Sequence, residues 1–206
     1  MSNKVIYIFL IAFSILAFSN TVKAEELRNG YKYPGYIIQN NYDTIYGYIK
    51  YSDVVRSQNK CEFYKNENDK KPFKKYKPKE LKGYLISDVL YKTINYSGGL
   101  MSKPLRFLKV NTEGELTIFT FWEEGSIPYN REREQTAVYF KWHDKKNVKP
   151  ITNSKFAFSF AKKMSAYVAD NKELSKKVRN KEKGYNLLHL YDIINEYNEW
   201  YAAKNN

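Results

Sequence analysis

The spacing of hydrophobic and polar residues changes near residue 150, and the change predicts two kinds of structure along the chain. From residue 31 to residue 150, short runs of alternating apolar and polar residues are separated by Asn, Asp, Gly and Ser. This alternation is typical of antiparallel strands joined by turns. From residue 154 onwards, apolar residues recur three and four positions apart, as on one face of a helix. We therefore expect an α+β fold, with a barrel-like or strongly curved antiparallel sheet at 31–150 followed by a three-helix segment at 154–203.

The first hairpin, at residues 35–51, shows the strand pattern clearly. Turn residues at 40–43 separate an apolar run at 36–38 from a strand at 44–51 that is rich in aromatic and β-branched side chains. Odd positions of this second strand can face the core, and even positions, which include two tyrosines, can face water. Gly47 in mid-strand indicates a bulge or a close approach of two backbones.

The segment at 115–122 is apolar on both of its faces. Leu116 and Ile118 share one face, and Phe119 and Phe121 share the other. A strand that is covered on both sides lies in the interior of a sheet, so we expect this strand to be central. The turn signals along the β part predict seven to nine strands in all.

The tail predicts three helices. An apolar stripe at helical spacing marks the first of them, at Phe156, Phe160, Met164 and Tyr167. Asn171 is placed to cap a second helix, and Gly184 is placed to end it. Asn186 is placed to cap the last helix, whose expected stripe is Leu187, Leu190, Tyr191, Ile194, Tyr197 and Tyr201. Because no flexible linker separates the helices from the strands, we expect a single domain at 25–206.

The N-terminus has the pattern of a secretory signal peptide at 1–24. Lys4 precedes an apolar run at 5–18, and small residues at the −3 and −1 positions precede Glu25. An uncleaved membrane anchor is the alternative, but the 14 residues of this run are few for a span that needs about 20. We therefore expect cleavage and export to the periplasm, the outer envelope or the extracellular space, with no transmembrane segment in the mature chain.

The chain is strongly basic. Its formal net charge is +13, and the processed chain keeps +11 because residues 1–24 hold two lysines and no acid. Such an excess favours anionic partners such as lipid headgroups and acidic polysaccharides. A compositional origin is the alternative, since the chain is rich in Lys, Asn, Ile, Tyr and Phe, the residues of AT-rich codons. The dense charge at 65–79 is typical of a solvated loop.

Several short motifs are similar to those of one family of exported proteins. They are DTIYGYIKY at 43–51, YKPKELKGYLI at 76–86, FLKVNTEGELTIF at 107–119 and ADNKEL at 169–174. The chain resembles uncharacterised exported proteins of Bacteroidota, in which a gDTIxGxI hairpin, a strand after a Y-x-P motif and a helical tail recur. This resemblance implies export and the extent of the domain, and it implies no catalytic residues and no activity.

Little in the sequence indicates catalysis. The two histidines, His143 and His189, lack metal-ligand spacing, and no GxSxG, P-loop, GxGxxG or CxxC motif occurs. Carboxylate pairs at 123–124 and 132/134 could serve a glycosidase only if two carboxyl groups lay about 5–9.5 Å apart across a sugar. Cys61 is expected to be a small buried hydrophobe rather than a reactive thiol. We expect no cofactor and no metal.

Binding is the function that the sequence favours. Strand aromatics lie near basic residues, and such rings can stack on sugars or hold cations, although cross-strand packing of the same rings is the alternative. The candidate binding residues are Tyr46, Tyr48, Tyr139, Lys141, Trp142 and His143. A binding module should present a shallow face of Tyr, Trp and Lys, whereas an enzyme should bring Asp or Glu together with His in a deep pocket.

We therefore expect an exported, non-catalytic binding or envelope-associated protein. Its partner would be an anionic envelope glycan or lipid, or another envelope protein, and nucleic acid is a poor partner for an exported protein. The alternative is a hydrolase that acts on an envelope glycan or lipid through its carboxylates.

Overall fold

The computed structural model describes residues 26–96, 105–122, 136–142, 149–150 and 154–205, with the backbone alone at 136–142, 149–150 and 154–155. The strands are β1 (Lys32–Gln39), β2 (Thr44–Lys50), β3 (Cys61–Tyr64), β4 (Lys74–Tyr76), β5 (Leu81–Ile86), β6 (Val89–Asn95), β7 (Leu105–Thr112), β8 (Leu116–Trp122), β9 (Thr136–Trp142) and β10 (Lys149–Pro150). The helices are α1 (Val54–Ser57), α2 (Ser154–Phe158), α3 (Phe160–Tyr167), α4 (Lys172–Arg179) and α5 (Leu190–Asn205), with short 3₁₀ helices η1 (Pro78–Glu80) and η2 (Leu187–His189).

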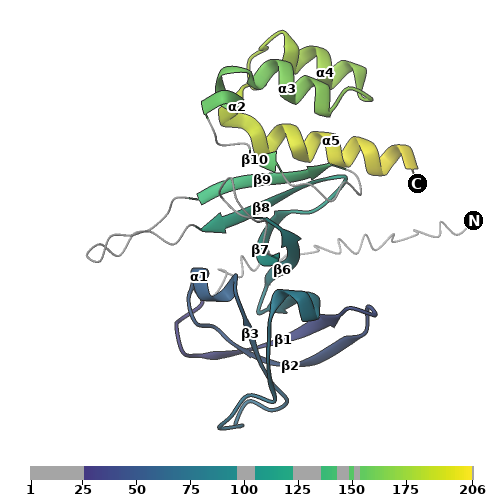
Figure 1. The fold of residues 1–206 in the computed structure, drawn as a ribbon. Helices are drawn as coiled ribbons and strands as arrows, with labels where there is room; N and C mark the ends of the chain where they lie inside the picture. Colours follow the sequence, from purple (N-terminus) through teal and green to yellow (C-terminus); the bar gives the residue numbers. More distant parts are fainter. Residues whose placement is uncertain (1–25, 97–104, 123–135, 143–148, 151–153, 206) are drawn as a thin grey trace, which may run out of the picture.

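The strands form one antiparallel sheet in the order β10-β9-β8-β7-β6-β5-β1-β2-β3-β4. Figure 1 shows β1, β2 and β3 at one end of the molecule and helices α2 to α5 at the other, with β6 and β7 between them. The predicted α+β fold is therefore confirmed. The described residues contain ten strands rather than seven to nine, because the chain also forms the very short β4 and β10.

The sheet is curved and open. Its end strands, β4 and β10, do not pair with each other in the described residues. Glycines allow neighbouring strands to approach closely: a Cβ atom on Gly35 would collide with the carbonyl oxygen of Leu85, and one on Gly47 would lie 2.6 Å from the Phe63 ring. The close approach predicted at Gly47 is thus confirmed, and the sheet is curved rather than closed into a barrel.

Strand β8 is central at the helical end of the sheet, as predicted. It pairs with β7 on one side and β9 on the other, and all of its residues are buried. Leu116 and Ile118 pack against the helices, whereas Phe119 and Phe121 pack on the opposite face. The other end of the sheet has its own cluster of Tyr33, Ile37, Ile49, Cys61, Phe63, Tyr76, Leu81, Tyr84, Ile86, Tyr91 and Phe107.

The predicted three-helix segment is present, with its first helix broken into α2 and α3 at Ser159. Asn171 caps α4 as expected, because its Oδ1 accepts a hydrogen bond of 3.1 Å from the Leu174 backbone N–H. Asn186 caps η2, which leads directly into α5, and its Oδ1 accepts a bond of 2.9 Å from the Leu188 N–H. Both caps follow from the preference of Asn for this position.

The end of α4 differs from the prediction. The helix ends at Arg179, so the end predicted at Gly184 is wrong. The backbone N–H groups of Lys181 and Glu182 donate to carbonyls of the last turn, in the pattern of a Schellman motif. Lys181 takes the left-handed conformation, with φ of +55°, that glycine usually supplies at this position.

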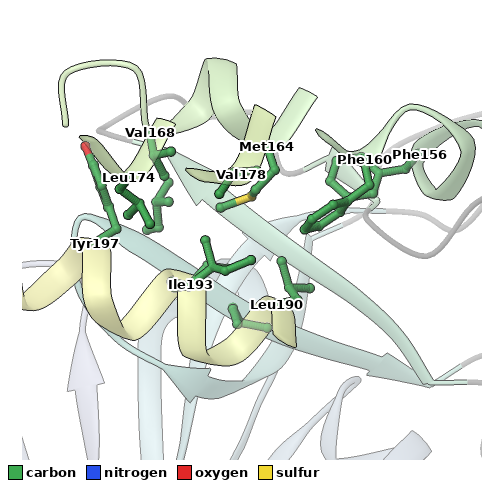
Figure 2. Packing of buried hydrophobic residues seen from close by; sticks show 12 residues of the cluster. Phe156, Phe160, Met164, Val168, Leu174, Val178, Leu190, Ile193 and Tyr197 are labelled. Atoms are coloured by element: carbon green, nitrogen blue, oxygen red, sulfur yellow. The ribbon is translucent and has the colours of Figure 1, made fainter. Parts of the chain in front are cut away.

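Helix α5 packs on α3 and α4 through a stripe that differs in part from the predicted one. The buried residues of this helix are Leu190, Ile193, Ile194 and Tyr197. Figure 2 shows Leu190, Ile193 and Tyr197 turned toward the apolar side chains of the other helices. Leu187 and Tyr191 are 36% and 41% exposed. The predicted stripe therefore begins one turn too early, at Leu187, because residues 187–189 form a 3₁₀ helix with another side-chain spacing. It also names Tyr191 where the structure buries Ile193.

Two side-chain amides hold the ends of β8. Asn198 of α5 donates from Nδ2 to the Leu116 carbonyl and accepts from the Leu116 N–H, both at 2.9 Å. Gln58 donates from Nε2 to the Trp122 carbonyl at 2.8 Å and accepts from the Trp122 N–H at 2.7 Å. Gln58 directly follows α1, a helical turn between β2 and β3.

Candidate functional site

The outward surface of β1 to β4 carries rows of tyrosine and lysine. Residues that pair across antiparallel strands point to the same face of a sheet. The register pairs Tyr36 with Tyr46 and Tyr48 with Tyr64, and it forms a charged row of Lys32, Lys50, Glu62 and Lys75. We call this surface the tyrosine–lysine face, and it consists of Lys32, Tyr36, Tyr46, Tyr48, Lys50, Glu62, Tyr64 and Lys75.

The opposite surface of the same strands explains why these side chains lie outside. Ile37, Ile49 and Phe63 alternate with them along the strands and are each at most 1% exposed. Gly47 leaves room for the Phe63 ring to pack against the backbone of β2. Alternation with period two then places the tyrosines and lysines on the other surface of these strands.

The tyrosines of the face range from exposed to buried. Tyr46 is 76% exposed, and its ring meets that of Tyr36 edge to face with 5.6 Å between centroids. Tyr48 is half-buried. Tyr64 is buried, and the Lys32 ammonium group lies 4.5 Å from its ring centroid. Cross-strand packing of Tyr36 and Tyr46 thus coexists with a largely exposed Tyr46 ring that a ligand can contact.

The charges of the face are unbalanced. Glu62 is buried, with the Lys60 ammonium 2.6 Å and the Lys75 ammonium 3.8 Å from its Oε1. Burial alone raises the pKa of the Glu62 carboxyl, but the hydrogen bond from Lys60 and the charges of Lys75 and Lys50 outweigh burial, and the pKa lies below its usual value. The carboxylate stays ionised at neutral pH and neutralises only one of the lysines around it, so the face is positively charged.

The lysine-rich segment at 65–79 borders this face. The Lys32 ammonium donates to the backbone carbonyls of Glu67 and Asp69, which holds the segment against the start of β1. Phe73 in the same segment is 57% exposed. Strand β4 and η1 form within the segment, so only part of it is the solvated loop that its charge predicts.

The candidate residues from the sequence fall into two groups. Tyr46 and Tyr48 lie together on the tyrosine–lysine face, in β2. By backbone placement, β9 carries Tyr139, Lys141 and Trp142. Five strands separate β9 from β2 in the sheet, so the structure does not bring these residues to Tyr46 and Tyr48. His143 lies outside the described residues.

Several residues of the face were not singled out from the sequence. The period of two that joins Tyr46 to Tyr48 also reaches Lys50, and the alternation of CEFY places Glu62 and Tyr64 on one face. The sequence does not show which strand lies beside β2, and that pairing is what brings these residues to the same surface.

The described residues hold few of the groups that catalysis would use. His189 places Nδ1 3.0 Å from Oδ1 of Asn186, at the start of the last helix. No group of three or more His, Cys, Asp or Glu in the described ranges is placed to hold a metal ion. Cys61 is 1% exposed and burial raises the pKa of its thiol, which confirms a small buried hydrophobe. The carboxylate pairs at 123–124 and 132/134 lie outside the described residues.

No helix in the part of the chain that the structure describes is long and apolar enough to span a membrane. Comparisons with protein-family models, with curated proteins and with solved structures found no match. Function is therefore inferred from this chain's own residues.

Proposed function

We propose that the chain is an exported, non-catalytic binding protein that holds an acidic glycan of the cell envelope on the tyrosine–lysine face. The observation that supports this most is the exposed Tyr46 ring on the same strand face as a row of lysines. A tyrosine ring offers an apolar face for a sugar ring, and its hydroxyl can hydrogen-bond. Lysine ammonium groups attract the carboxylate or sulfate groups of the same polymer.

The shape of the surface favours an extended ligand. The face is built from strands, so its side chains form parallel rows instead of lining an enclosed cavity. An extended polysaccharide can lie along such rows and contact rings and charges at several positions. The signal-peptide pattern and the resemblance to exported proteins support an envelope or extracellular setting, where acidic glycans occur.

The alternative, hydrolysis of an envelope glycan or lipid, rests on sequence alone. Its carboxylate pairs and His143 lie outside the described residues. A turnover assay on any glycan that binds separates the two functions. If the wild-type chain cleaves the glycan and His143→Ala abolishes cleavage, the hydrolase replaces the binding protein.

The binding test uses a polyuronate such as alginate, with affinity measured by calorimetry at low and at high salt. Tyr46→Ser and Lys50→Gln should each weaken binding about tenfold, which corresponds to ~1.4 kcal/mol. Tyr31→Ser is the matched aromatic control, since Tyr31 is 60% exposed and lies outside the face. Lys172→Gln on α4 is the matched charge control. Salt should weaken binding, because exposed charges are screened beyond about 8 Å at physiological ionic strength.

Two results would contradict the proposal. One is equal affinity of Tyr46→Ser and the wild-type chain, since Tyr46 is mostly exposed and its loss leaves the core intact. The other is no binding at low salt, which would leave composition as the source of the basic charge. Export is tested separately by sequencing the N-terminus of protein from the cell envelope: Glu25 is expected, and an intact Met1 would contradict cleavage.

A further inference from the structure

A cleft opens at the helical end of the molecule, away from the tyrosine–lysine face. It lies between residues 157–162 of α2 and α3 and residues 179–187 after α4, and its volume is about 750 Å³. Ala157, Phe160, Ala161 and Tyr185 give it apolar walls. Figure 1 places α2 and the strands β1 to β3 at opposite ends of the molecule. A ligand at the cleft and a ligand on the tyrosine–lysine face would therefore bind at separate places.

Two large apolar side chains stand out at this cleft. Phe158 lines it and is 94% exposed, and Leu188, next to the lining residue Leu187, is 91% exposed. By contrast, the neighbours Phe156 and Phe160 are buried in the helical core. Phe158 and Leu188 are the two most exposed large apolar side chains of the described residues, and apolar side chains that gather on a surface mark interaction sites.

Three cations line the same cleft. They are Lys162, Arg179 and Lys181, and no Asp or Glu among the described residues lines it. The described residues contain no ion pair for any of these three, although the neighbouring Lys177 pairs with both Glu173 and Glu196. The cleft therefore combines apolar tips with uncompensated positive charge.

We propose that this end of the molecule docks on an anionic lipid leaflet, with Phe158 and Leu188 inserted among the acyl chains and a lipid phosphate held by the cations of the cleft. Apolar tips flanked by Lys and Arg are the composition of surfaces that lie in a membrane interface. Basic residues near an anionic leaflet add binding energy that falls off within a screening length. Both side chains are almost fully exposed, so both are free to insert into a fluid interface.

The docking would leave the strands of the tyrosine–lysine face at the end of the molecule that lies farther from the membrane (Figure 1). The lipid proposal does not depend on glycan binding. Each can fail while the other holds.

The test measures co-sedimentation with vesicles of phosphatidylcholine alone and with added phosphatidylglycerol. The protein is used as the cell exports it, with the same sequenced N-terminus in all variants, so that any contribution of residues 1–24 cancels. The apolar variant is Phe158→Ser with Leu188→Ser, and its control is Phe73→Ser with Tyr42→Ser, which removes two exposed rings from the β end. The charge variant is Arg179→Gln with Lys181→Gln, and its control is Lys172→Gln with Lys176→Gln on α4.

Binding should require phosphatidylglycerol, and it should fall by about an order of magnitude or more in both cleft variants and remain in both controls. Lys181→Gly adds a variant that is expected to fold at least as well, because glycine suits the positive φ of this position. It should keep its melting temperature and still bind anionic vesicles more weakly than the wild-type chain.

Three outcomes would overturn the proposal. Cleft variants that bind as well as their controls would exclude the cleft as the membrane site. Equal binding to neutral and anionic vesicles would exclude recognition of charge. A wild-type chain that ignores vesicles but dimerises through Phe158 and Leu188, with a monomeric apolar variant in light scattering, would assign this face to a second copy of the chain.

Discussion

Replacing Gln58 should destabilise the fold more than its place in a polar stretch indicates. The residue is 2% exposed, and its side chain forms two hydrogen bonds with the backbone of Trp122. The backbone carbonyl of Gln58 accepts a further bond of 2.9 Å from the Phe107 N–H. At the end of β8, Gln58 therefore supplies the hydrogen bonds that a neighbouring strand would otherwise make. Gln58→Ala leaves the N–H and the carbonyl of Trp122 without their partner, and a cavity remains where the side chain was.

The magnitude follows from these two groups. Each buried polar group left unpaired costs about 1–3 kcal/mol, so the variant should lose about 2–6 kcal/mol of unfolding free energy. Urea unfolding followed by fluorescence measures this loss, and an unchanged slope with denaturant confirms that the unfolding transition is comparable. Gln39→Ala is the control, since Gln39 is also in the β part and has no side-chain hydrogen bond in the described residues. A loss below about 1 kcal/mol in Gln58→Ala, or an equal loss in the control, would refute the role of the amide.

Gln58→Glu makes the test sharper. Only a protonated carboxyl can both donate to the Trp122 carbonyl and accept from its N–H, so burial and this bond should raise the pKa of the new carboxyl in the folded state. A raised folded-state pKa stabilises the protein below the unfolded pKa, and this contribution is lost as the pH rises through the folded value. The variant should therefore approach wild-type stability in acid and fall behind it at neutral pH, and a constant difference across pH would contradict the geometry.

Three further predictions concern other parts of the molecule. Gly114→Ala should lower the free energy of unfolding by about 1–3 kcal/mol, because the new Cβ would meet the Asn198 amide, with Oδ1 at 2.7 Å. The double variant with Asn198→Ala should lose less than the sum of the two single losses, and additive losses in urea unfolding would contradict the contact. The pKa of Glu62 is lowered in the folded state, so its contribution to stability is present above the unfolded pKa near 4.5 and is lost as the pH falls through the folded pKa. Glu62→Gln should therefore lose less stability than the wild-type chain as the pH falls into the acid range, and an unchanged acid dependence would count against the pairing with Lys60. Cys61 should resist thiol reagents at pH 8 in the native protein and react fully in denaturant, because burial raises the pKa of its thiol, and rapid labelling of the native chain would show otherwise.

The elements that the sequence predicted well are those set by neighbours within a few residues. The apolar residues on both faces of the 115–122 segment predicted burial of both faces, and both faces of β8 are buried. The Asn171 side chain caps α4 because the N–H that it accepts from lies only three residues away. The prediction that α4 ends at Gly184 was wrong, because Lys181 takes the left-handed conformation that ends the helix earlier, and composition does not reveal this.

The candidate site depended on partners that are distant in sequence. Tyr46 and Tyr48 were visible as solvent-facing residues of one strand, but only the pairing of β2 with β1 and β3 added the other rings and the charged row. Tyr139, Lys141 and Trp142 had the same local pattern and belong to a strand at the other end of the sheet.

Long-range contacts decided the rest of the molecule. The side chain of Gln58 hydrogen-bonds to a backbone 64 residues away in sequence, and that of Asn198 to one 82 residues away. The local sequence around either amide therefore does not distinguish it from an amide that faces water. Local periodicity fixes which backbone hydrogen bonds a segment makes with itself or offers to a neighbour. Which neighbour arrives, and which side chains remain uncovered, is fixed by the packing of the whole chain, because burial is a property of assembled surfaces.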